Sequence, residues 1–278
     1  MKIRAYAKVN LGLRVFGRRE DGFHQIHSLL QNIDLADELV LERGGRGIEL
    51  EVEPPLEIPP EENLVWRAAE LISKTVNLQP NLRIELTKKI PMGAGLGGGS
   101  SDAAAVLVGV NELLKLGMDR AELLKLALEL GSDVPFFLEG GTCLVGGRGE
   151  RLKGLPPLPG YHLVLLIPPF ALSTAEVYRE FDELGEDEGG EGSLRLPRLL
   201  RNDLERAALR LRPELEGYRD LLAEAEPDFF GMSGSGPTWF AGFKDRGRAE
   251  AVAAEATEVG LPGRALLTGL VDHGHEIV

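Results

Sequence analysis

The chain has 278 residues, 43% of them hydrophobic, and a formal net charge of -13 at pH 7. This length suits one large domain or two smaller ones, with enough apolar side chains to fill a core. The acidic balance excludes nucleic acids and anionic membranes as expected partners, because proteins bind both mainly through basic surfaces. No apolar run approaches the length of a membrane span and no signal peptide opens the chain, so we expect a cytoplasmic protein.

Cys143 is the only cysteine, which leaves no partner for a disulfide or for a cysteine metal site. We therefore expect Cys143 to be a small buried apolar residue. The histidines and acidic residues show no spacing typical of metal ligands, so the sequence predicts no protein metal site.

The first segment predicts a half-buried strand with one apolar and one polar face. Apolar residues occupy the odd positions from Ile3 to Leu11, and the even positions between them form the polar face. Lys8 and Asn10 therefore point the same way from that polar face. A solvated side chain is the ordinary interpretation of a lone strand lysine, so Lys8 alone does not indicate a site.

A polar turn follows at residues 17–24, with Phe23 and His24 at its exit. An aromatic ring beside an imidazole can stack on a nucleic base and hydrogen-bond to it. A turn that buries its phenylalanine is the alternative, and the pattern alone does not separate the two.

Residues 38–42 and 48–53 predict two further strands, and the prolines of 54–60 predict a stiff turn. Asn63 is the predicted N-cap of a helix over 64–74. The apolar stripe of this helix consists of Val65, Ala68, Ala69 and Ile72.

A strand over 82–86 leads into a glycine-rich loop that precedes an apolar helix. Five glycines in the seven positions 93–99 let backbone N–H groups approach a polyanion closely. We expect phosphate to bind there, at the start of a helix over 103–116 that the three preceding polar residues cap. The candidate phosphate-binding residues are Pro91, Met92, Gly93, Ala94, Gly95, Leu96, Gly97, Gly98, Gly99, Ser100, Ser101 and Asp102.

The pattern Gly93-x-Gly95-x-x-Gly98 also fits the fingerprint of dinucleotide-binding proteins. That fold requires a strand after the helix, whereas residues 120–130 predict a second helix that ends at Gly131. A P-loop is excluded because the Gly-Lys-Ser/Thr ending is missing, and a protein-kinase loop because its companion motifs are absent. A flexible linker is disfavoured because the segment joins a strand to a long apolar helix.

Asp133 follows this helix end and precedes a Val-Pro pair, which predicts extended backbone, and two phenylalanines, which predict burial. A carboxylate that is only partly solvated suits a general base. Asp133 could equally well be the N-cap of a following short turn. Only another motif can decide between the two interpretations. A strand over 142–145 comes next.

The proline-rich connector at 155–160 is the predicted boundary between domains 1–157 and 158–278. After it we expect a strand at 161–167 and a helix that the capping box 173–176 opens. A mobile acidic loop at 185–193 follows, and helical periodicity then extends over 196–225 with an interruption at Pro213. The remaining elements are a strand at 239–243, a helix at 246–259 and a strand at 264–267. These strands and helices together predict an α+β fold.

A second loop of small residues, Gly231-Met232-Ser233-Gly234-Ser235-Gly236, lies between a short strand and the strand at 239–243. Such a loop can close on a substrate phosphate or simply join a hairpin. Taken alone, this loop is better interpreted as a hairpin connection.

Three of these segments together resemble the GHMP small-molecule kinase superfamily, in which three spaced motifs form one site. The motifs are Lys8-Val9-Asn10-Leu11, the loop at 91–102 and the loop at 231–236. Within the superfamily the resemblance is closest to kinases whose acceptor is a cytidine-diphosphate-linked polyol, and it spans nearly the whole chain. It rests further on residues 7–11, 17–24, 131–137, Ser28-Leu29-Leu30-Gln31 and Asn202-Asp203-Leu204-Glu205.

The resemblance implies an ATP-dependent kinase with the GHMP kinase fold. Its N-terminal ATP-binding domain would be similar to a ribosomal-protein fold, and its C-terminal domain would be ferredoxin-like. ATP would arrive with Mg²⁺ and phosphorylate the 2-hydroxyl of the polyol, in non-mevalonate isoprenoid precursor biosynthesis. The partners implied are these small molecules alone, with the protein a monomer or a weak homodimer.

The resemblance also assigns roles to individual residues. Lys8 and Asp133 would be the catalytic pair, and Asn10 would contact the polyol. Phe23 and His24 would receive cytosine, although many family members have tyrosine at the position of Phe23, so no phenol hydroxyl is available here. The further candidates are Thr174 and Tyr178 for the substrate and, by position only, Asn63 and Lys88 for adenine.

Other functions stay open at this point. A kinase of the same superfamily could act on homoserine, mevalonate or a sugar, and would then leave the cytosine-binding residues unused. A dinucleotide-dependent oxidoreductase could use the glycine loop. A nucleic-acid module is disfavoured by the acidic charge, although the implied first domain is similar to a ribosomal-protein fold.

Overall fold

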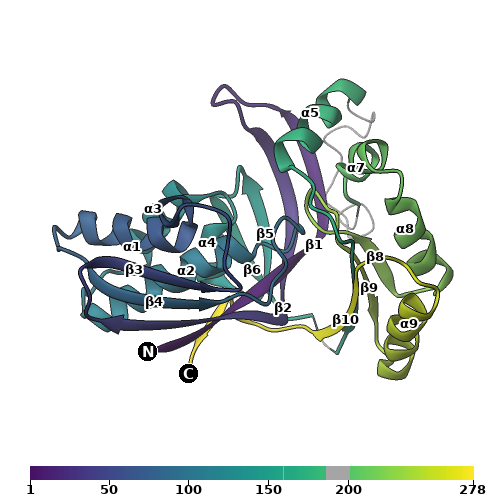
Figure 1. Ribbon diagram of the computed structural model, residues 1–278. Coiled ribbons are helices and arrows are strands. Elements are labelled where there is room, and N and C mark those ends of the chain that lie inside the picture. Colours follow the sequence, from purple (N-terminus) through teal and green to yellow (C-terminus); the bar gives the residue numbers. More distant parts are fainter. Residues whose placement is uncertain (159, 186–200) are drawn as a thin grey trace.

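The computed structural model describes residues 1–158, 160–185 and 201–278, which form two lobes around two β-sheets (Figure 1). A seven-stranded sheet has the order β11-β1-β2-β4-β3, and β5 pairs with both β2 and β6. A four-stranded sheet has the order β10-β7-β9-β8. Within the described residues, no helix is both long and apolar enough to cross a membrane.

The first lobe contains the seven-stranded sheet, with helices packed on one face of it (Figure 1). Its strands are β1 (Lys2–Arg18), β2 (His24–Arg43), β3 (Gly47–Glu53), β4 (Asn81–Thr87), β5 (Thr142–Gly147), β6 (Arg151–Leu155) and β11 (His275–Ile277). Its helices are η1 (Pro60–Glu62), α1 (Leu64–Thr75), α2 (Gly98–Leu114), α3 (Arg120–Leu130) and α4 (Val134–Glu139).

Local signals place two of these helices as predicted. Asn63 caps α1 by accepting a hydrogen bond from the Val65 N–H, and the four residues of the predicted apolar stripe are all buried. Helix α3 has the predicted bounds and ends at Gly131. Cys143 is also buried, in the core beneath these helices.

The prediction that β1 has one solvated face is wrong from Tyr6 to Asn10. Arg4 near the start of the strand is 41% exposed, but Tyr6, Lys8 and Asn10 on the same face are buried, with Lys8 only 3% and Asn10 only 6% exposed. The two small-residue loops cover them: the Lys8 N–H donates to the Leu96 carbonyl over 3.0 Å, and the Asn10 N–H donates to Ser233 Oγ over 3.1 Å. Burial of Lys8 therefore depends on segments far away in the sequence.

Strand β1 also contributes to more than one core. The pairing of β1 with β2 shifts register after Tyr6, at one of three irregularities between these strands. Ile3 therefore packs in the core under the helices, Val9 packs in a cluster between the two sheets, and Leu13 packs in the second lobe. The long β1–β2 hairpin thus ties the two lobes together (Figure 1).

The second lobe contains the four-stranded sheet. Its strands are β7 (His162–Ile167), β8 (Phe229–Met232), β9 (Trp239–Phe243) and β10 (Arg264–Gly269). Its helices are α5 (Thr174–Leu184), α7 (Glu205–Leu211), α8 (Leu215–Glu224) and α9 (Arg246–Glu258). The loop at 233–238 joins β8 and β9 as a hairpin connection. Ser233 Oγ in this loop accepts a hydrogen bond from the Asn10 N–H of the first lobe.

The second lobe departs from the prediction at residues 201–204 and agrees with it in part at the start of α5. Residues 201–204 are not helical as predicted, because Asn202 instead forms a parallel bridge with Leu13 of β1. The predicted acidic loop at 185–193, after Gly185, and residues 196–200 of the predicted helical stretch lie outside the described residues. Ser173 caps α5 by accepting from the Glu176 N–H, which is one half of the predicted capping box.

The connector after β6 carries the chain from one sheet to the other, and β11 brings it back to pair with β1. Both chain ends consequently lie close together on the first lobe (Figure 1). The domain boundary after residue 157 stays a prediction.

Candidate active site

The glycine loop ends in a helix that begins earlier than predicted. Helix α2 starts at Gly98, not at residue 103, and its N-cap is Gly97, which has φ 72° and makes no side-chain capping bond. Ser100, Ser101 and Asp102 therefore lie inside the first turns and do not cap. Because the first N–H groups of a helix lack intrahelical acceptors, this glycine start leaves donors available to an anion.

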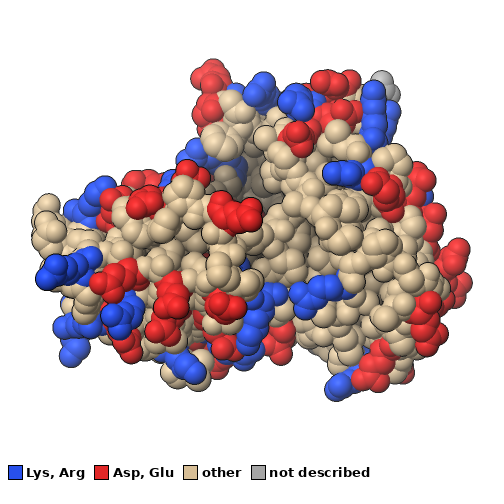
Figure 2. Space-filling view, viewed as in Figure 1, with Lys and Arg blue, Asp and Glu red and all other residues tan. Residues whose placement is uncertain are grey.

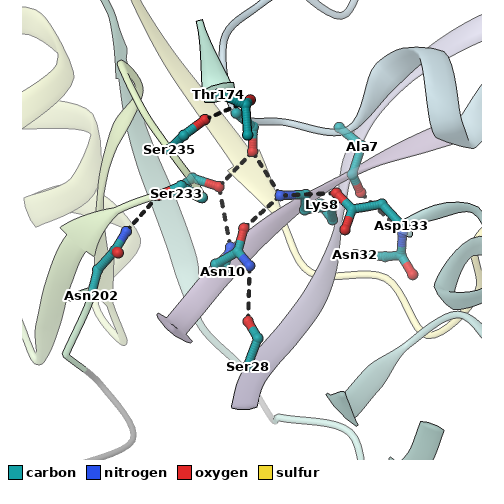
Figure 3. Close-up of polar contacts among 12 residues, drawn as sticks. Ala7, Lys8, Asn10, Ser28, Asn32, Asp133, Thr174, Asn202, Ser233 and Ser235 are labelled. Atoms are coloured by element: carbon teal, nitrogen blue, oxygen red, sulfur yellow. Dashed lines mark hydrogen bonds and ion pairs between the residues drawn. The ribbon is translucent and has the colours of Figure 1, made fainter. Parts of the chain in front are cut away.

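The two small-residue loops are in direct contact at Gly95. A Cβ at this position would lie 2.2 Å from the Ser233 carbonyl oxygen and 2.9 Å from that of Gly236. Ser233 Oγ donates to the Gly95 carbonyl over 2.9 Å and accepts the Asn10 N–H. The structure thus joins the second and third motifs to the first strand (Figure 3).

The ammonium group of Lys8 lies where these segments meet. Its Nζ donates to the Gly95 carbonyl over 2.9 Å and to Asn10 Oδ1, and lies 3.6 Å from Asp133 Oδ2 (Figure 3). Desolvation lowers the pKa of Lys8, while the negative charge of Asp133 opposes that shift. Asn10 is itself fixed, since its Nδ2 donates to Ser28 Oγ over 2.8 Å.

Asp133 stands immediately before α4, and its side chain is 41% exposed. Its carboxylate makes no capping hydrogen bond, because the residue has α-helical backbone angles and the carboxylate turns toward Lys8. The predicted extended backbone after Asp133 is wrong. Pro135 lies in the first turn of α4, where a missing N–H costs no helical hydrogen bond.

Phe23 is 48% exposed, so the alternative in which the turn buries this ring is wrong. The Arg148 guanidinium lies 5.1 Å from the centroid of the Phe23 ring. The rings of His24 and Tyr178 have centroids 5.0 Å apart, and His24 Nε2 lies 2.7 Å from Asp182 Oδ1. Residues from the β1–β2 hairpin and from α5 therefore face each other across the two lobes, where the surface is hollowed (Figure 2).

Two observations connect the residues of α5 to the three motifs around Lys8. Burial raises the pKa of Tyr178, and the charge of Asp133 raises it further. Thr174 Oγ1 lies 3.0 Å from Ser235 Oγ in the second loop. The predicted substrate residues of α5 are thus near both the loop and the carboxylate.

Sequence reasoning missed a buried ionic group behind the glycine loop. Lys88 Nζ contacts Asp37 Oδ2 and lies 2.7 Å from Asp102 Oδ2, and all three side chains are nearly or fully buried. Desolvation raises the pKa of Asp102 to about 8, despite the opposing charge of Lys88. The available signal was Asp102 itself, because a carboxylate among the apolar residues of a helix requires a buried partner.

The two residues considered for adenine by position have other partners in the structure. Lys88 is committed to this ionic group, and Asn63 Oδ1 is committed to the cap of α1. Among the residues described, no group of three or more His, Cys, Asp or Glu side chains is placed to hold a metal ion.

Two family models match the chain: "GHMP kinases N terminal domain" at residues 63–141 and "GHMP kinases C terminal" at residues 179–260. Among solved structures, a 4-(cytidine 5'-diphospho)-2C-methyl-D-erythritol kinase is 39% identical, with a TM-score of 0.79 over 97% of this chain and 99% of that one. A homoserine kinase from Cytophaga hutchinsonii has a TM-score of 0.76 at 20% identity, which shows a shared fold alone.

Curated relatives agree with these matches. A 4-diphosphocytidyl-2-C-methyl-D-erythritol kinase of Pelotomaculum thermopropionicum is 43% identical over 90% of this chain and 91% of its own length. The kinase of the same name from Moorella thermoacetica is 42% identical over 91% of this chain and 94% of its own length. The predicted GHMP kinase fold and ATP-dependent kinase activity are therefore confirmed, and the oxidoreductase and nucleic-acid alternatives fall away. With both halves matched and relatives this similar over nearly its full length, the chain belongs to the 4-diphosphocytidyl-2-C-methyl-D-erythritol kinase family of the GHMP kinases.

Proposed function

We propose that this protein transfers the γ-phosphoryl group of ATP to the 2-hydroxyl of 4-diphosphocytidyl-2-C-methyl-D-erythritol, in non-mevalonate isoprenoid precursor biosynthesis. The observation that carries this proposal is the position of the Lys8 ammonium, between the Gly95 carbonyl of the glycine loop and the Asp133 carboxylate. This arrangement supplies a cation beside a base at the end of a phosphate-binding loop. The names of the relatives supply the acceptor.

The glycine loop would hold the ATP phosphates through residues 91–102. The N-terminus of α2 presents its unpartnered N–H groups and its positive dipole end to them. Mg²⁺ would accompany ATP and offset the remaining phosphate charge. Phosphoryl transfer needs little covalent participation from the protein, so alignment and charge stabilisation would be the main contributions of this loop.

Asp133 would act as the general base. The acceptor oxygen bonds to the γ-phosphorus as the bond from that phosphorus to the β,γ-bridging oxygen of ATP breaks, and the hydroxyl proton moves to the Asp133 carboxylate. A side chain that is 41% exposed can be reached by substrate, whereas Lys8 at 3% is held in place to orient Asp133 and stabilise the incoming phosphoryl group.

The cytidine end of the substrate would bind in the hollow between the lobes. The exposed Phe23 ring offers a stacking surface, the adjacent residue His24 pairs with Tyr178, and Thr174 contacts Ser235 in the loop at 233–238. Asn10 would contact the polyol, since its amide lies next to the Lys8 ammonium.

The direct test measures ADP release by the purified protein with Mg·ATP and four acceptors: the cytidyl substrate, homoserine, mevalonate and galactose. We expect turnover with the cytidyl substrate alone. We also expect Phe23→Ala to raise KM for that substrate by about 10-fold, because base stacking on an aromatic ring contributes about 1–3 kcal/mol. Turnover of another acceptor with no effect of Phe23→Ala would contradict the assigned substrate.

A second prediction concerns the contact between the two loops. Gly95→Ala is expected to lower kcat/KM by about 10²-fold, because the new Cβ would collide with the carbonyls of Ser233 and Gly236. Gly47 is a matched control, since its φ of +77° is close to the +75° of Gly95 but nothing lies within 4 Å of its added Cβ. Equal losses in Gly95→Ala and Gly47→Ala would attribute the effect to backbone strain and not to the loop contact.

A further inference from the structure

Asn202 and Asp203 belong to a segment that the mechanism above does not use. Their backbone pairs with β1, which is the strand that carries Lys8 and Asn10. The Leu13 N–H donates to the Arg201 carbonyl and the Asp203 N–H donates to the Leu13 carbonyl, both over 2.9 Å. The Asp203 carboxylate strengthens this pairing by accepting the Val15 N–H over 3.0 Å. The segment is therefore fixed relative to β1 by main-chain contacts.

The side chain of Asn202 connects this fixed segment to the second small-residue loop. It is only 6% exposed, and its Nδ2 donates to the Met232 and Gly234 carbonyls, each over 2.7 Å. Its Oδ1 accepts the Leu204 N–H over 3.0 Å, so both hydrogens and one oxygen lone pair of the amide are used. The two carbonyls belong to the residues immediately before and after Ser233.

Ser233 in turn connects this loop to an acceptor of the Lys8 ammonium. Ser233 Oγ and Lys8 Nζ donate to the same acceptor, the Gly95 carbonyl, each over 2.9 Å. The neighbouring backbone leaves little freedom, because a Cβ at Gly234 would lie 3.2 Å from Asn10 Oδ1 and 3.4 Å from Lys8 Nζ. A shift of the loop would therefore move the acceptor that positions Lys8.

We propose that Asn202 is a positioning residue for phosphoryl transfer. By holding the carbonyls on both sides of Ser233, Asn202 fixes the loop at 233–238 to β1. Through the Gly95 carbonyl, this loop in turn fixes the ammonium of Lys8 relative to Asp133. Asn202 itself touches none of the reacting groups. Removing it affects the alignment of bound reactants more than their binding, so kcat changes and the two KM values do not. This inference rests on the proposed function for its catalytic readout.

The principal variant is Asn202→Asp, which keeps the size and the acceptor for the Leu204 N–H but loses both donors. We expect kcat to fall by about 10–10²-fold, as misplacement of catalytic groups by about 1 Å does, with KM for ATP and for the acceptor within about twofold. Asn111→Ala is the matched control. Asn111 is also buried and its amide also bonds backbone groups, but those belong to Met118, between α2 and α3. We expect it to leave kcat unchanged.

Two further measurements separate positioning from a general loss of stability. In a double-mutant cycle, Asn202→Asp and Ser233→Ala are expected to be strongly non-additive in kcat, because both act through the same loop. Amide hydrogen exchange, which needs no substrate, is expected to speed up in peptides covering 93–97 and 232–238 in Asn202→Asp, and not in Asn111→Ala. If Asn202→Asp lowers only the melting temperature, or if the cycle is additive, the inference is wrong. Failure of the proposed function would appear differently, as an inactive wild-type protein with normal exchange protection.

Discussion

Asp133→Asn is expected to lower kcat by about 10²–10⁴-fold, the usual loss when a general base is removed. The substitution keeps the shape of the side chain and removes its ability to accept a proton. Lys8 remains in place, because its bonds to the Gly95 carbonyl and to Asn10 do not involve Asp133. The KM for ATP is therefore expected to change little, and steady-state ADP release measures both constants.

The pH dependence of the residual activity provides a second readout of this pair. Desolvation lowers the pKa of Lys8, and Asp133 is the group that opposes this shift. Without the carboxylate the pKa of Lys8 falls further, and the cation is lost as pH rises through that lower value. The alkaline decline of kcat is therefore expected to begin at a lower pH in Asp133→Asn than in the wild-type protein.

Asp228→Asn is a suitable control for the first prediction. Asp228 is a carboxylate in the second lobe that accepts the Lys244 N–H over 3.0 Å, outside the candidate site. We expect its kcat and pH profile to match the wild type. Near-normal turnover in Asp133→Asn would show that another group accepts the proton.

Lys88→Met is expected to lower the free energy of unfolding by about 3–5 kcal/mol, the usual loss when one member of a buried ion pair is removed. Asp37 and Asp102 would then remain in the core without a counter-charge, since their side chains are only 0% and 2% exposed. Asp37 also accepts the Ile90 N–H just before the glycine loop, so the loop would lose support. The urea midpoint measures the loss of stability.

This loss is expected to grow with pH. Desolvation raises the pKa of Asp102 to about 8 in the native protein, and Lys88 is the main influence that opposes the shift. In Lys88→Met the native pKa rises further, whereas the unfolded value stays at about 3.9. The native variant then holds a proton that the unfolded chain has released, so its free energy of unfolding falls as pH rises. The difference between variant and wild type is expected to be smaller at about pH 6 than at about pH 9.

Lys89→Met tests whether burial is the cause. Lys89 pairs with Glu38, but the two side chains are 49% and 46% exposed, and such surface pairs contribute about 0–1 kcal/mol. We expect the Lys89→Met midpoint to stay near the wild-type value at both pH values. A comparable loss in the two variants would contradict the role of the buried carboxylates.

Much of the secondary structure could be predicted from local signals. The Asn63 cap, the apolar stripe of α1 and the bounds of α3 depend on residues within one or two turns of each other, and they were predicted correctly. The start of α2 was missed although its signals are local, because the φ of 72° at Gly97 lets the helix begin on glycines that have no helical propensity of their own. Strand β11 was missed because it is three residues long and is formed only by pairing with β1.

The chemistry of the site depended on both the local sequence and the tertiary contacts. The residue types and their motifs, with Lys8 on a strand, a glycine loop before a helix and Asp133 at a helix end, could be identified from the sequence alone. The sequence alone could not predict the burial of Lys8 or the Gly95 carbonyl that Lys8 and Ser233 share as an acceptor. It also could not predict the partners of Lys88 and Asn202. Each of these contacts joins residues distant in the chain or different lobes. Local sequence therefore determined which groups are present and which elements carry them, whereas tertiary packing decided which groups lost their water and which charges and carbonyls became partners.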